Sequence, residues 1–380
     1  MFFLWTLLPA LYVSWRLFWY LPYRLPVRIA FSLLAILGCE FHFITWLVSG
    51  NMFSPELPLW VMTGLGWWFG TLVILSCALV LRDVVFLILS HKGVTHRSGL
   101  VLLVLAMLIS VVGVRNAVQV PDVRTVELSL PALPVGFEGY RIVQIADIHT
   151  SALLRRDWLE RVISRSNALD ADLLVLTGDL SDGLLSRRKK DIAPLAQLRA
   201  KDGVYAITGN HEYYFDYSAW MQAFKALDIP FLLNRHVRLS RGGDSLILAG
   251  VTDEAALRIG EAGPDIGKAL AGVGVTEPVI LLDHRPVHAK RNAAHGVMLQ
   301  LSGHTHGGMI RGLDQAIKPA NGGFISGYYP VGNMALYVSN GAGLWNGFPL
   351  RLGRPAEITQ LILRRGPAAI LPSSSTHHSG

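Results

Sequence analysis

Cysteine is almost absent from this sequence of 380 residues, and its two examples, Cys39 and Cys77, both lie in long apolar segments. The polar remainder of the chain therefore has no disulfide framework and no thiolate metal ligand. Charged residues are also scarce, at 16%. Because the one dense basic run is Arg187–Lys190, the formal net charge of +7 does not indicate nucleic-acid binding. Attraction to anionic lipid or to an anionic substrate is the milder interpretation of that charge.

Long hydrophobic runs, by contrast, are abundant. Hydrophobic residues make up 51% of the chain and the mean hydropathy is +0.39, which is too apolar for an ordinary soluble protein. A helix needs about 20 apolar residues to cross a bilayer, and a cleaved signal peptide would explain only one such segment. We predict an all-α transmembrane domain of about four helices over residues 1–120, formed by the segments Phe2–Leu21, Val27–Ser49, Leu57–Ser90 and Leu100–Val118.

The connections between these segments predict an orientation. The first connection carries Arg24 and Arg28, the third carries Lys92 and Arg97, and the second has no basic residue. Loops rich in Lys and Arg remain in the cytoplasm. Both chain termini, and everything after Val120, are therefore predicted to lie outside the cytoplasm.

Two ionisable residues, Glu40 and His42, lie midway along the second segment. Ionisable groups at that depth are costly and are usually paired or functional. A structural polar contact is favoured over a role in ion transport, with Arg16, Arg82 or Asp83 as the candidate partners.

The chain after residue 120 has a different texture. Apolar runs of four to six residues alternate with amphipathic stretches, the pattern of strands buried on both faces. Helical spacing of apolar residues predicts a helix over Asp157–Ala168, and Ser240–Ser245 resembles a hairpin turn. We predict an α/β layered domain over residues 121–366, followed by a disordered tail of low complexity over residues 367–380.

Side chains with oxygen or imidazole ligand atoms directly follow five of the predicted strands. They are Asp147, His149, Asp179, Asn210, His211, His284, His304 and His306. Open α/β sheets place their sites at the carboxyl ends of strands. The members of the pairs Asp147/His149 and His304/His306 are two residues apart, so on an extended stretch both would point to one side. Glycine precedes Asp179, Asn210 and His304, which allows close approach of the backbone. Seven such ligands are too many for one tetrahedral ion but suit two ions that share a carboxylate.

The ordered set D-x-H, G-D, G-N-H-E, H and G-H-T-H-G-G closely resembles the calcineurin-like metallophosphoesterases, over roughly Tyr140–Leu363. It is most similar to membrane-associated bacterial members, some of which act on lipid-linked phosphates. The resemblance implies a β-sandwich flanked by helices and two divalent ions, of Mn, Zn or Fe.

The same resemblance assigns roles by motif. Asp179 would bridge the two ions, and His211 would contact the phosphate and protonate the leaving oxygen, during in-line attack on phosphorus by a metal-activated hydroxide. Met309 stands where glutamine is common, a difference that bears on substrate preference. One ion would be held by Asp147, His149 and His306, and the other by Asn210, His284 and His304.

Several residues near the motifs admit two interpretations. Asp182 could hydrogen-bond a metal ligand or stabilise a turn, with equal weight. Arg285 could pair with a substrate phosphate. Tyr213 and Tyr214 could form an apolar lip for the lipid or aryl part of a substrate, or could simply pack beneath a loop. Surface or packing roles are favoured for His288 and His295.

The leading hypothesis is a membrane-embedded two-metal phosphoesterase that hydrolyses a phosphodiester, a pyrophosphate or a phosphomonoester. Four helices exceed what tethering requires, so a phospholipid or lipid-carrier phosphate leads the candidate substrates, and membrane lipids are the expected partners. The bacterial resemblance places the protein in the cytoplasmic (inner) membrane with its catalytic domain on the periplasmic side. The alternatives are a non-catalytic receptor or scaffold with the same fold, and a transporter with an appended domain. Metal identity and oligomeric state stay open.

Overall fold

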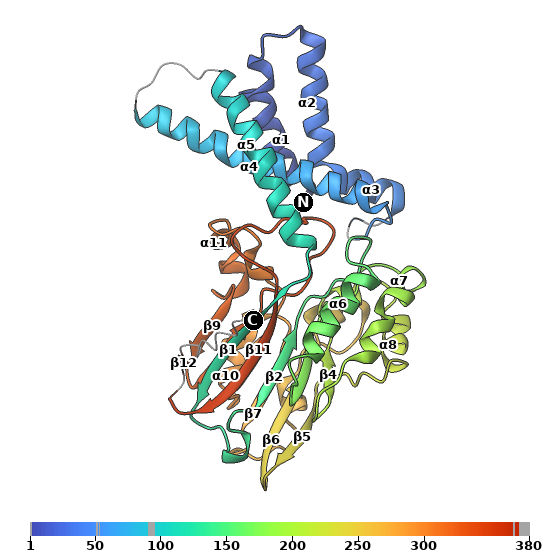
Figure 1. The fold of residues 1–380 in the computed structure, drawn as a ribbon, viewed down its shortest axis with the longest axis vertical. Coiled ribbons are helices and arrows are strands. Elements are labelled where there is room, and N and C mark those ends of the chain that lie inside the picture. Colours follow the sequence, from blue (N-terminus) through green and yellow to red (C-terminus); the bar gives the residue numbers. More distant parts are fainter. Residues whose placement is uncertain (1, 51, 53, 90–95, 368, 372–380) are drawn as a thin grey trace, which may run out of the picture. The chain divides into compact units, whose positions relative to one another are not determined.

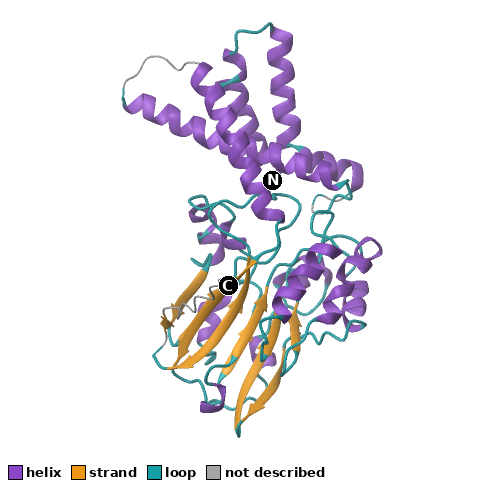
Figure 2. Cartoon of the chain, viewed as in Figure 1, coloured by secondary structure: helices purple, strands orange, loops and turns teal. Residues whose placement is uncertain are grey.

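The computed structural model describes residues 2–50, 52, 54–89, 96–367 and 369–371 (Figure 1). The chain divides into two compact units. One is a helical unit of Met1–Val118 with Trp345–Leu352, and the other is an α/β unit of Gln119–Leu344 with Gly353–Gly380. The secondary structure of each unit is drawn in Figure 2. Residues 345–352 lie within the predicted α/β domain in sequence, yet they pack in the helical unit, which no local pattern indicated.

The helical unit contains the predicted apolar helices. Two of them, α4 and α5, are long and apolar enough to cross a membrane. A third span results if α2 and α3, bent by 64° at their junction, count as one. The helices are α1 (Phe2–Arg16), α2 (Leu25–Cys39), α3 (Phe41–Ser49), α4 (Leu59–Ile88) and α5 (His96–Val118).

The first predicted span differs from the expectation. Helix α1 has 15 residues and contains Pro9, so it extends about 22 Å, short of the roughly 30 Å of a hydrocarbon core. The chain then turns through a short 3₁₀ helix at Phe18–Tyr20. Of the predicted third connection, Lys92 lies outside the described residues.

Both ionisable residues of the second apolar segment have partners inside the helical unit. Glu40 accepts a hydrogen bond from the Thr6 hydroxyl at 2.9 Å, and the buried imidazole of His42 pairs through Nε2 with the backbone oxygen of Gly347. The expected partner Arg16 instead pairs with Asp83 at 2.5 Å. These contacts favour the structural interpretation of Glu40 and His42.

Replacing His42 by alanine should therefore destabilise the helical unit, because it leaves the buried Gly347 carbonyl without this partner, at a cost of about 1–3 kcal/mol. Thermal unfolding of the detergent-solubilised protein measures the change. Thr63→Ala is the control, since Thr63 is half-buried and its hydroxyl donates to the Leu59 oxygen of its own helix. An unchanged melting temperature in the His42 variant would contradict the structural role.

The α/β unit is a sandwich of two mixed six-stranded sheets, with orders β12-β1-β11-β2-β3-β4 and β5-β6-β7-β8-β10-β9. The neighbours β2, β3 and β4 are parallel, as are β6, β7, β8 and β10. The first sheet comprises β1 (Asp122–Leu130), β2 (Arg141–Ile145), β3 (Leu173–Thr177), β4 (Val204–Ile207), β11 (Glu357–Arg365) and β12 (Ala369–Leu371). The second comprises β5 (Arg235–Arg241), β6 (Asp244–Gly250), β7 (Val279–Leu282), β8 (Leu299–Ser302), β9 (Gly327–Val331) and β10 (Met334–Val338).

Alternating side chains of both sheets fill the space between them, so that Leu299 and Leu301 of β8 join the same buried cluster as Ile142 of β2. The opposite face of the second sheet packs against short helices, with Ile247 of β6 beside Ala289. The layered α/β fold with flanking helices is thus confirmed. These helices are α6 (Arg156–Asn167), α7 (Leu185–Ile192), α8 (Tyr217–Lys225), α9 (Ile266–Ala269), α10 (Ala289–Ala293) and α11 (Asp314–Ile317).

The structure confirms two local predictions within this unit and corrects a third. Helix α6 and the antiparallel hairpin of β5 and β6 are confirmed. The prediction of a disordered tail from residue 367 is wrong for Ala369–Leu371, which pairs with β1 as strand β12. Its polar remainder, residues 372–380, lies outside the described residues. An exposed strand edge on β1 therefore decided the conformation of these three residues.

Candidate metal centre

The loops after β2 and β3 run side by side and continue the pairing of their strands. The backbone amide of Asp147 donates to Gly178 O at 3.1 Å, and that of His149 donates to Asp179 O at 3.0 Å. Further along, Asp182 N donates to Thr150 O at 2.9 Å. Two motifs that are separate in sequence thereby meet at the carboxyl end of the first sheet, as expected for neighbouring parallel strands.

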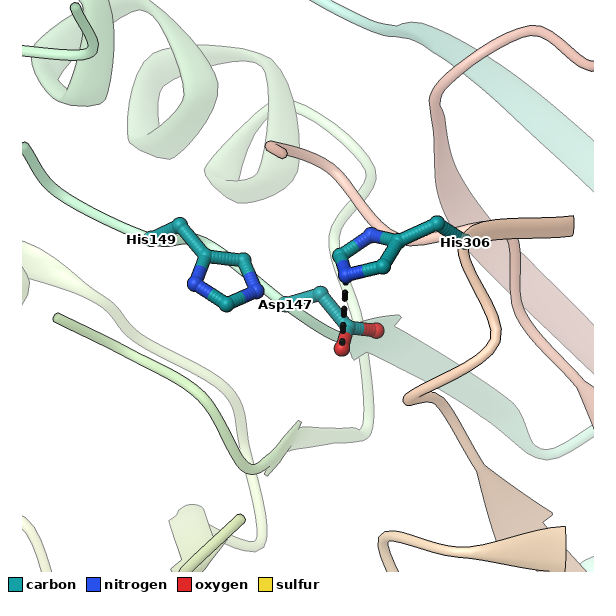
Figure 3. Close-up of side chains that lie close together, drawn as sticks. All are labelled: Asp147, His149 and His306. Atoms are coloured by element: carbon teal, nitrogen blue, oxygen red, sulfur yellow. Dashed lines mark ion pairs between the residues drawn. The ribbon is translucent and has the colours of Figure 1, made fainter. Parts of the chain in front are cut away.

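A first group of ligands joins the two sheets. Asp147, His149 and His306 each offer one ligand atom within 4.8 Å of the others, and all three side chains are buried. Figure 3 shows His306 entering from the loop after β8, with its Nε2 atom 3.9 Å from Asp147 Oδ1. A metal ion here would connect the ends of strands from opposite layers.

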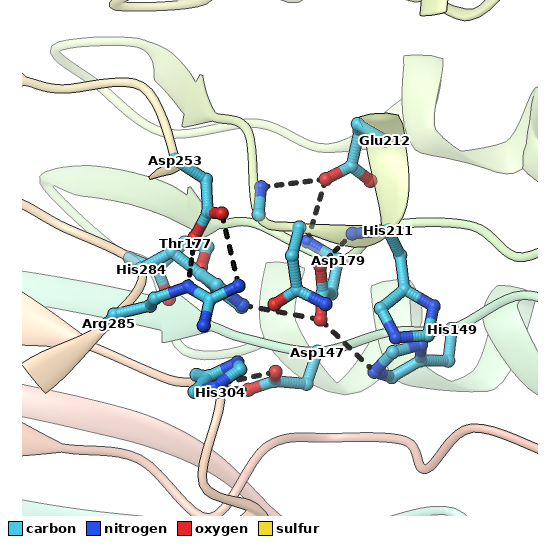
Figure 4. Close-up of polar contacts among 12 residues, drawn as sticks. Asp147, His149, Thr177, Asp179, His211, Glu212, Asp253, His284, Arg285 and His304 are labelled. Carbon is cyan, nitrogen blue, oxygen red and sulfur yellow. Dashed lines mark hydrogen bonds and ion pairs between the residues drawn. The ribbon is translucent and has the colours of Figure 1, made fainter. Parts of the chain in front are cut away.

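A second group is formed by Asp179, His284 and His304, again with ligand atoms within 4.8 Å of one another. Asp179 is the link between the groups, because its Oδ2 lies 3.6 Å from His149 Nε2 and 3.2 Å from His284 Nε2 (Figure 4). The amide oxygen of Asn210 is buried and makes no hydrogen bond with any described residue. The shared carboxylate is therefore placed where a bridging ligand is required.

The imidazole hydrogen bonds fit divalent cations. His284 Nδ1 lies 2.8 Å from Thr177 O, a carbonyl that can only accept, so Nδ1 carries the proton. His149 Nδ1 likewise faces Asp182 Oδ1 at 3.0 Å. The Nε2 atoms of both rings are buried, face Asp179 and make no hydrogen bond of acceptable geometry in the described part of the chain. Metal-binding histidines show this arrangement, with one nitrogen anchored and the other free to coordinate.

Burial of several carboxylates at one point gives the centre a strong demand for positive charge. Burial raises the pKa of Asp147 to about 6, against the opposing effect of His284. Burial and the charge of Asp179 raise the pKa of Glu212 to about 7. For His284, burial lowers the pKa, but the Asp179 carboxylate outweighs it and the pKa rises to about 10. Cations would relieve the repulsion that these shifts reflect.

The backbone is strained at the same place. Nine described residues other than glycine have positive φ, and five of them are predicted ligands: Asp147 (52°), His149 (47°), Asp179 (54°), His304 (70°) and His306 (50°). The left-handed region costs such residues roughly 1–2 kcal/mol each, and strain of this kind concentrates at functional sites. The expectation that the two ligand pairs lie on extended stretches is therefore wrong. Left-handed turns aim these side chains instead.

Glu212 is a structural support that the sequence interpretation missed. Its buried carboxylate accepts hydrogen bonds from the backbone amides of Asp179 at 3.0 Å, Leu180 at 2.7 Å and Gly209 at 2.7 Å. It thus holds the loops that carry Asp179 and Asn210 against each other. Glycine is required at position 209, because a Cβ there would lie 2.2 Å from Asp179 Oδ1. The acidic residue directly after G-N-H was the available signal.

The contacts of Asp182 decide between its two interpretations, a hydrogen bond to a metal ligand and the stabilisation of a turn. Oδ1 of this buried carboxylate lies 3.0 Å from His149 Nδ1 and 2.6 Å from His211 Nδ1. Burial raises the pKa of Asp182, but the two imidazoles outweigh it and the pKa falls to about 2. For His211, burial lowers the pKa, whereas Asp179 and Asp182 raise it to about 9. A single carboxylate therefore orients a candidate ligand and the candidate proton donor.

The remaining aromatic candidates differ in placement. Tyr213 is 4% exposed, hydrogen-bonds Thr208 at 2.7 Å and stacks on Tyr217, which favours packing over a lip. Tyr214 is half-buried beside His211 and accepts a hydrogen bond from Asn210 Nδ2 at 3.0 Å. Only Tyr214 borders the ligands directly.

The basic candidates are held by carboxylates. Arg285 pairs with the buried Asp253 through Nε at 2.6 Å and Nη2 at 3.2 Å. His288 lies between Asp283 and Glu254, and so supports the loop after His284. His295 bonds only to the Arg291 oxygen of its own segment among the contacts seen, in line with the surface role favoured for it.

Asp182→Asn should lower metal affinity and turnover by about 10–100-fold, because the neutral amide removes the negative charge that strengthens the hydrogen bonds from both imidazoles. Metal content of the purified protein and kcat/KM measure the two effects. Asp216→Asn is the matched control, since Asp216 is an exposed helix cap whose amide variant keeps its bond to Ala219 N. Equal behaviour of the two variants would show that Asp182 has no such role.

Comparison with known proteins gives a consistent picture. The family model described as calcineurin-like phosphoesterase matches residues 140–308. A Bos taurus protein named transmembrane protein with metallophosphoesterase domain is 41% identical over 283 residues, covering 71% of this chain and 63% of that protein. An uncharacterised metallophosphoesterase of Bacillus subtilis is 32% identical over 246 residues, which cover 63% of this chain and 84% of the Bacillus subtilis protein. A Danio rerio protein with the same name as the bovine one is 35% identical, and the chain spans 64% of it.

Proposed function

This chain belongs to the calcineurin-like metallophosphoesterases, and on that premise we propose that it is a metal-dependent hydrolase of phosphoric esters associated with a membrane. The observation that carries the proposal is the buried Asp179 carboxylate, which lies between the Nε2 atoms of His149 and His284, one from each group of candidate ligands. Within the described residues, the groups of ligand atoms that could hold a metal ion all lie around this centre.

Two divalent ions would be held by the groups that the motifs define, with Asp147, His149 and His306 on one side of Asp179 and Asn210, His284 and His304 on the other. Nitrogen and oxygen donors of this kind accept Mn, Fe or Zn, so availability decides the metal. When bound, the ions supply Lewis-acid stabilisation of phosphoryl oxygens and activation of water.

The protein's own groups complete the proposed chemistry. His211 would protonate the leaving oxygen, and its hydrogen bond to Asp182 and its raised pKa support this role. Arg285 donates hydrogen bonds from Nε and Nη2 to Asp253, and its Nη1 would contact a substrate phosphate. Both side chains border the shared carboxylate, on different sides (Figure 4).

The finer proposals concern substrate and location. Helices long and apolar enough to span a bilayer support membrane embedding, and a phosphodiester, pyrophosphate or phosphomonoester linked to a lipid is the favoured substrate. The basic residues of the first and third connections support a periplasmic α/β unit in a bacterial inner membrane. The names of the vertebrate relatives, as transmembrane proteins, support the membrane association alone.

Hydrolysis should fail when either part of the centre is removed. Asp179→Asn should abolish turnover together with binding of the ion pair, whereas His211→Ala should retain the metal and lose about 10²–10⁴-fold in kcat. Metal analysis and single-turnover assays of detergent-purified protein separate the two cases. If both variants hydrolyse the substrate at the wild-type rate, the activity does not come from this centre, and the non-catalytic scaffold would be favoured.

Arg285→Ala should raise KM more than it lowers kcat, because it removes a phosphate contact rather than the reacting groups. Asp253→Asn keeps the guanidinium and weakens only its orientation, so its effect should be intermediate. Assays with a small chromogenic phosphodiester and with a phospholipid in mixed micelles measure both. A KM unaltered by loss of Arg285 would exclude the contact.

Metal removal should also destabilise the fold. Excess Mn²⁺ or Zn²⁺ at 100 times its Kd stabilises a protein by about 2.7 kcal/mol for one site. Chelated wild-type protein should therefore melt at a lower temperature than reloaded protein, and Asp179→Asn should lose this difference. If metal fails to change the melting temperature of wild type, the centre does not bind it.

A further inference from the structure

Exposed apolar side chains are unevenly distributed over the α/β unit. Ten large hydrophobic residues of its described part are exposed, and six of them lie in segments that directly follow β3, β6, β7 or β8, at the end of the sandwich that carries the metal centre. Val135 and Val275 lie at the other end, before β2 and β7. The six are Leu184 (55%), Leu257 (65%), Ile259 (46%), Val287 (38%), Leu313 (44%) and Ile317 (37%).

Five of the six lie on three neighbouring segments, and we call these five residues the apolar rim: Leu257, Ile259, Val287, Leu313 and Ile317. Two ion pairs join the start of the 3₁₀ helix Glu254–Ile259 to the turn Pro286–His288. Their capping residues Asp253 and Arg285 pair at 2.6 Å, and His288 pairs with Glu254 at 2.9 Å. The segment that carries Leu313 and Ile317 continues to Gly322 beside the same turn, because a Cβ on Gly322 would lie 3.2 Å from Val287 Cα. The segments of the rim therefore meet at the turn that follows His284.

The rim is also basic. Residues 254–259, 286–293 and 309–321 carry five Lys or Arg residues, namely Arg258, Lys290, Arg291, Arg311 and Lys318, against two acidic residues, Glu254 and Asp314. Asp314 is buried and paired with Arg354, so it does not offset the surface charge. Helix α7, which Figure 1 shows at the same end of the sandwich as α11, adds the exposed Arg187, Lys189 and Lys190 beside Leu184.

Apolar side chains interspersed with Lys and Arg are the chemistry that binds the interface of an anionic bilayer: the apolar groups enter the headgroup boundary and the cations attract acidic lipids. We propose that the apolar rim docks the metal-bearing end of the α/β unit onto an anionic lipid surface. This inference rests on the membrane association proposed above and not on hydrolysis. Docking would bring the ester bond of a headgroup to the metal centre without extraction of the acyl chains.

The test uses the full chain in nanodiscs, with Cys39→Ser and Cys77→Ser removing the native thiols. Single cysteines replace Leu257 or Leu313 on the rim, and Val135 or Val275 at the opposite end as matched exposed controls. Each carries an environment-sensitive fluorophore, and the discs contain spin-labelled lipid quencher. Rim labels should emit at shorter wavelength and be quenched, more strongly when phosphatidylglycerol replaces part of the phosphatidylcholine, while the control labels should do neither.

A second set of variants tests whether docking requires the basic residues of the rim. Each basic residue near an anionic surface contributes about 1 kcal/mol, so Arg258→Glu and Arg311→Glu should each lower the docked-to-undocked ratio of the Leu313 label at least about fivefold. Equal quenching of rim and control labels would overturn the proposal. So would a rim label that shifts its emission without quenching by lipid, because a protein surface would then cover the rim. These readouts do not involve turnover, so docking without lipid hydrolysis would refute only the substrate proposal.

Discussion

The structure of this centre depends on the burial of carboxylates that repel one another. Asp147, Asp179, Asp182 and Glu212 are each at most 1% exposed. Charges withdrawn from water must be paired or must coordinate cations, since otherwise they neutralise by taking up protons. Backbone amides and imidazoles pair part of this charge, and the ligand atoms left facing Asp179 specify where further positive charge must be placed.

The fold supplies the rigidity that such a centre needs. Five candidate ligands have left-handed conformations that their side chains disfavour, so each must be held by its surroundings. The ladder between the loops after β2 and β3 and the triple acceptor Glu212 provide that support. Deeper in the sandwich, buried Gln144 donates to Thr177 Oγ1 and Ser302 O, which ties strands of both sheets together below the ligands.

The helical unit is connected to the centre through the chain itself. Ala342 and Gly343 donate hydrogen bonds to the backbone oxygens of Ala146 and Asp147, each at 2.8 Å. The residues that follow, Trp345–Leu352, belong to the helical unit, where Phe348 packs edge-on against Phe69. The loop that borders a candidate ligand therefore continues directly into the apolar helices, and His42 gains its structural explanation from the same segment.

The sequence by itself determined the layered α/β class, the presence of apolar helices and the candidate ligand side chains. Periodicity and strand-end position are local properties, and Asp179 or His304 is recognisable from its neighbours alone. Only the tertiary structure decided what these groups face. Several contacts depend on atoms that are distant in sequence: those of Asp182 with two imidazoles, of Glu212 with three backbone amides and of Arg285 with Asp253. The same holds for the pairing of residues 369–371 with β1 and for the packing of residues 345–352 in the helical unit. Left-handed ligand turns, too, are disfavoured by local propensity and persist only because surrounding hydrogen bonds hold them, so no local pattern could reveal them.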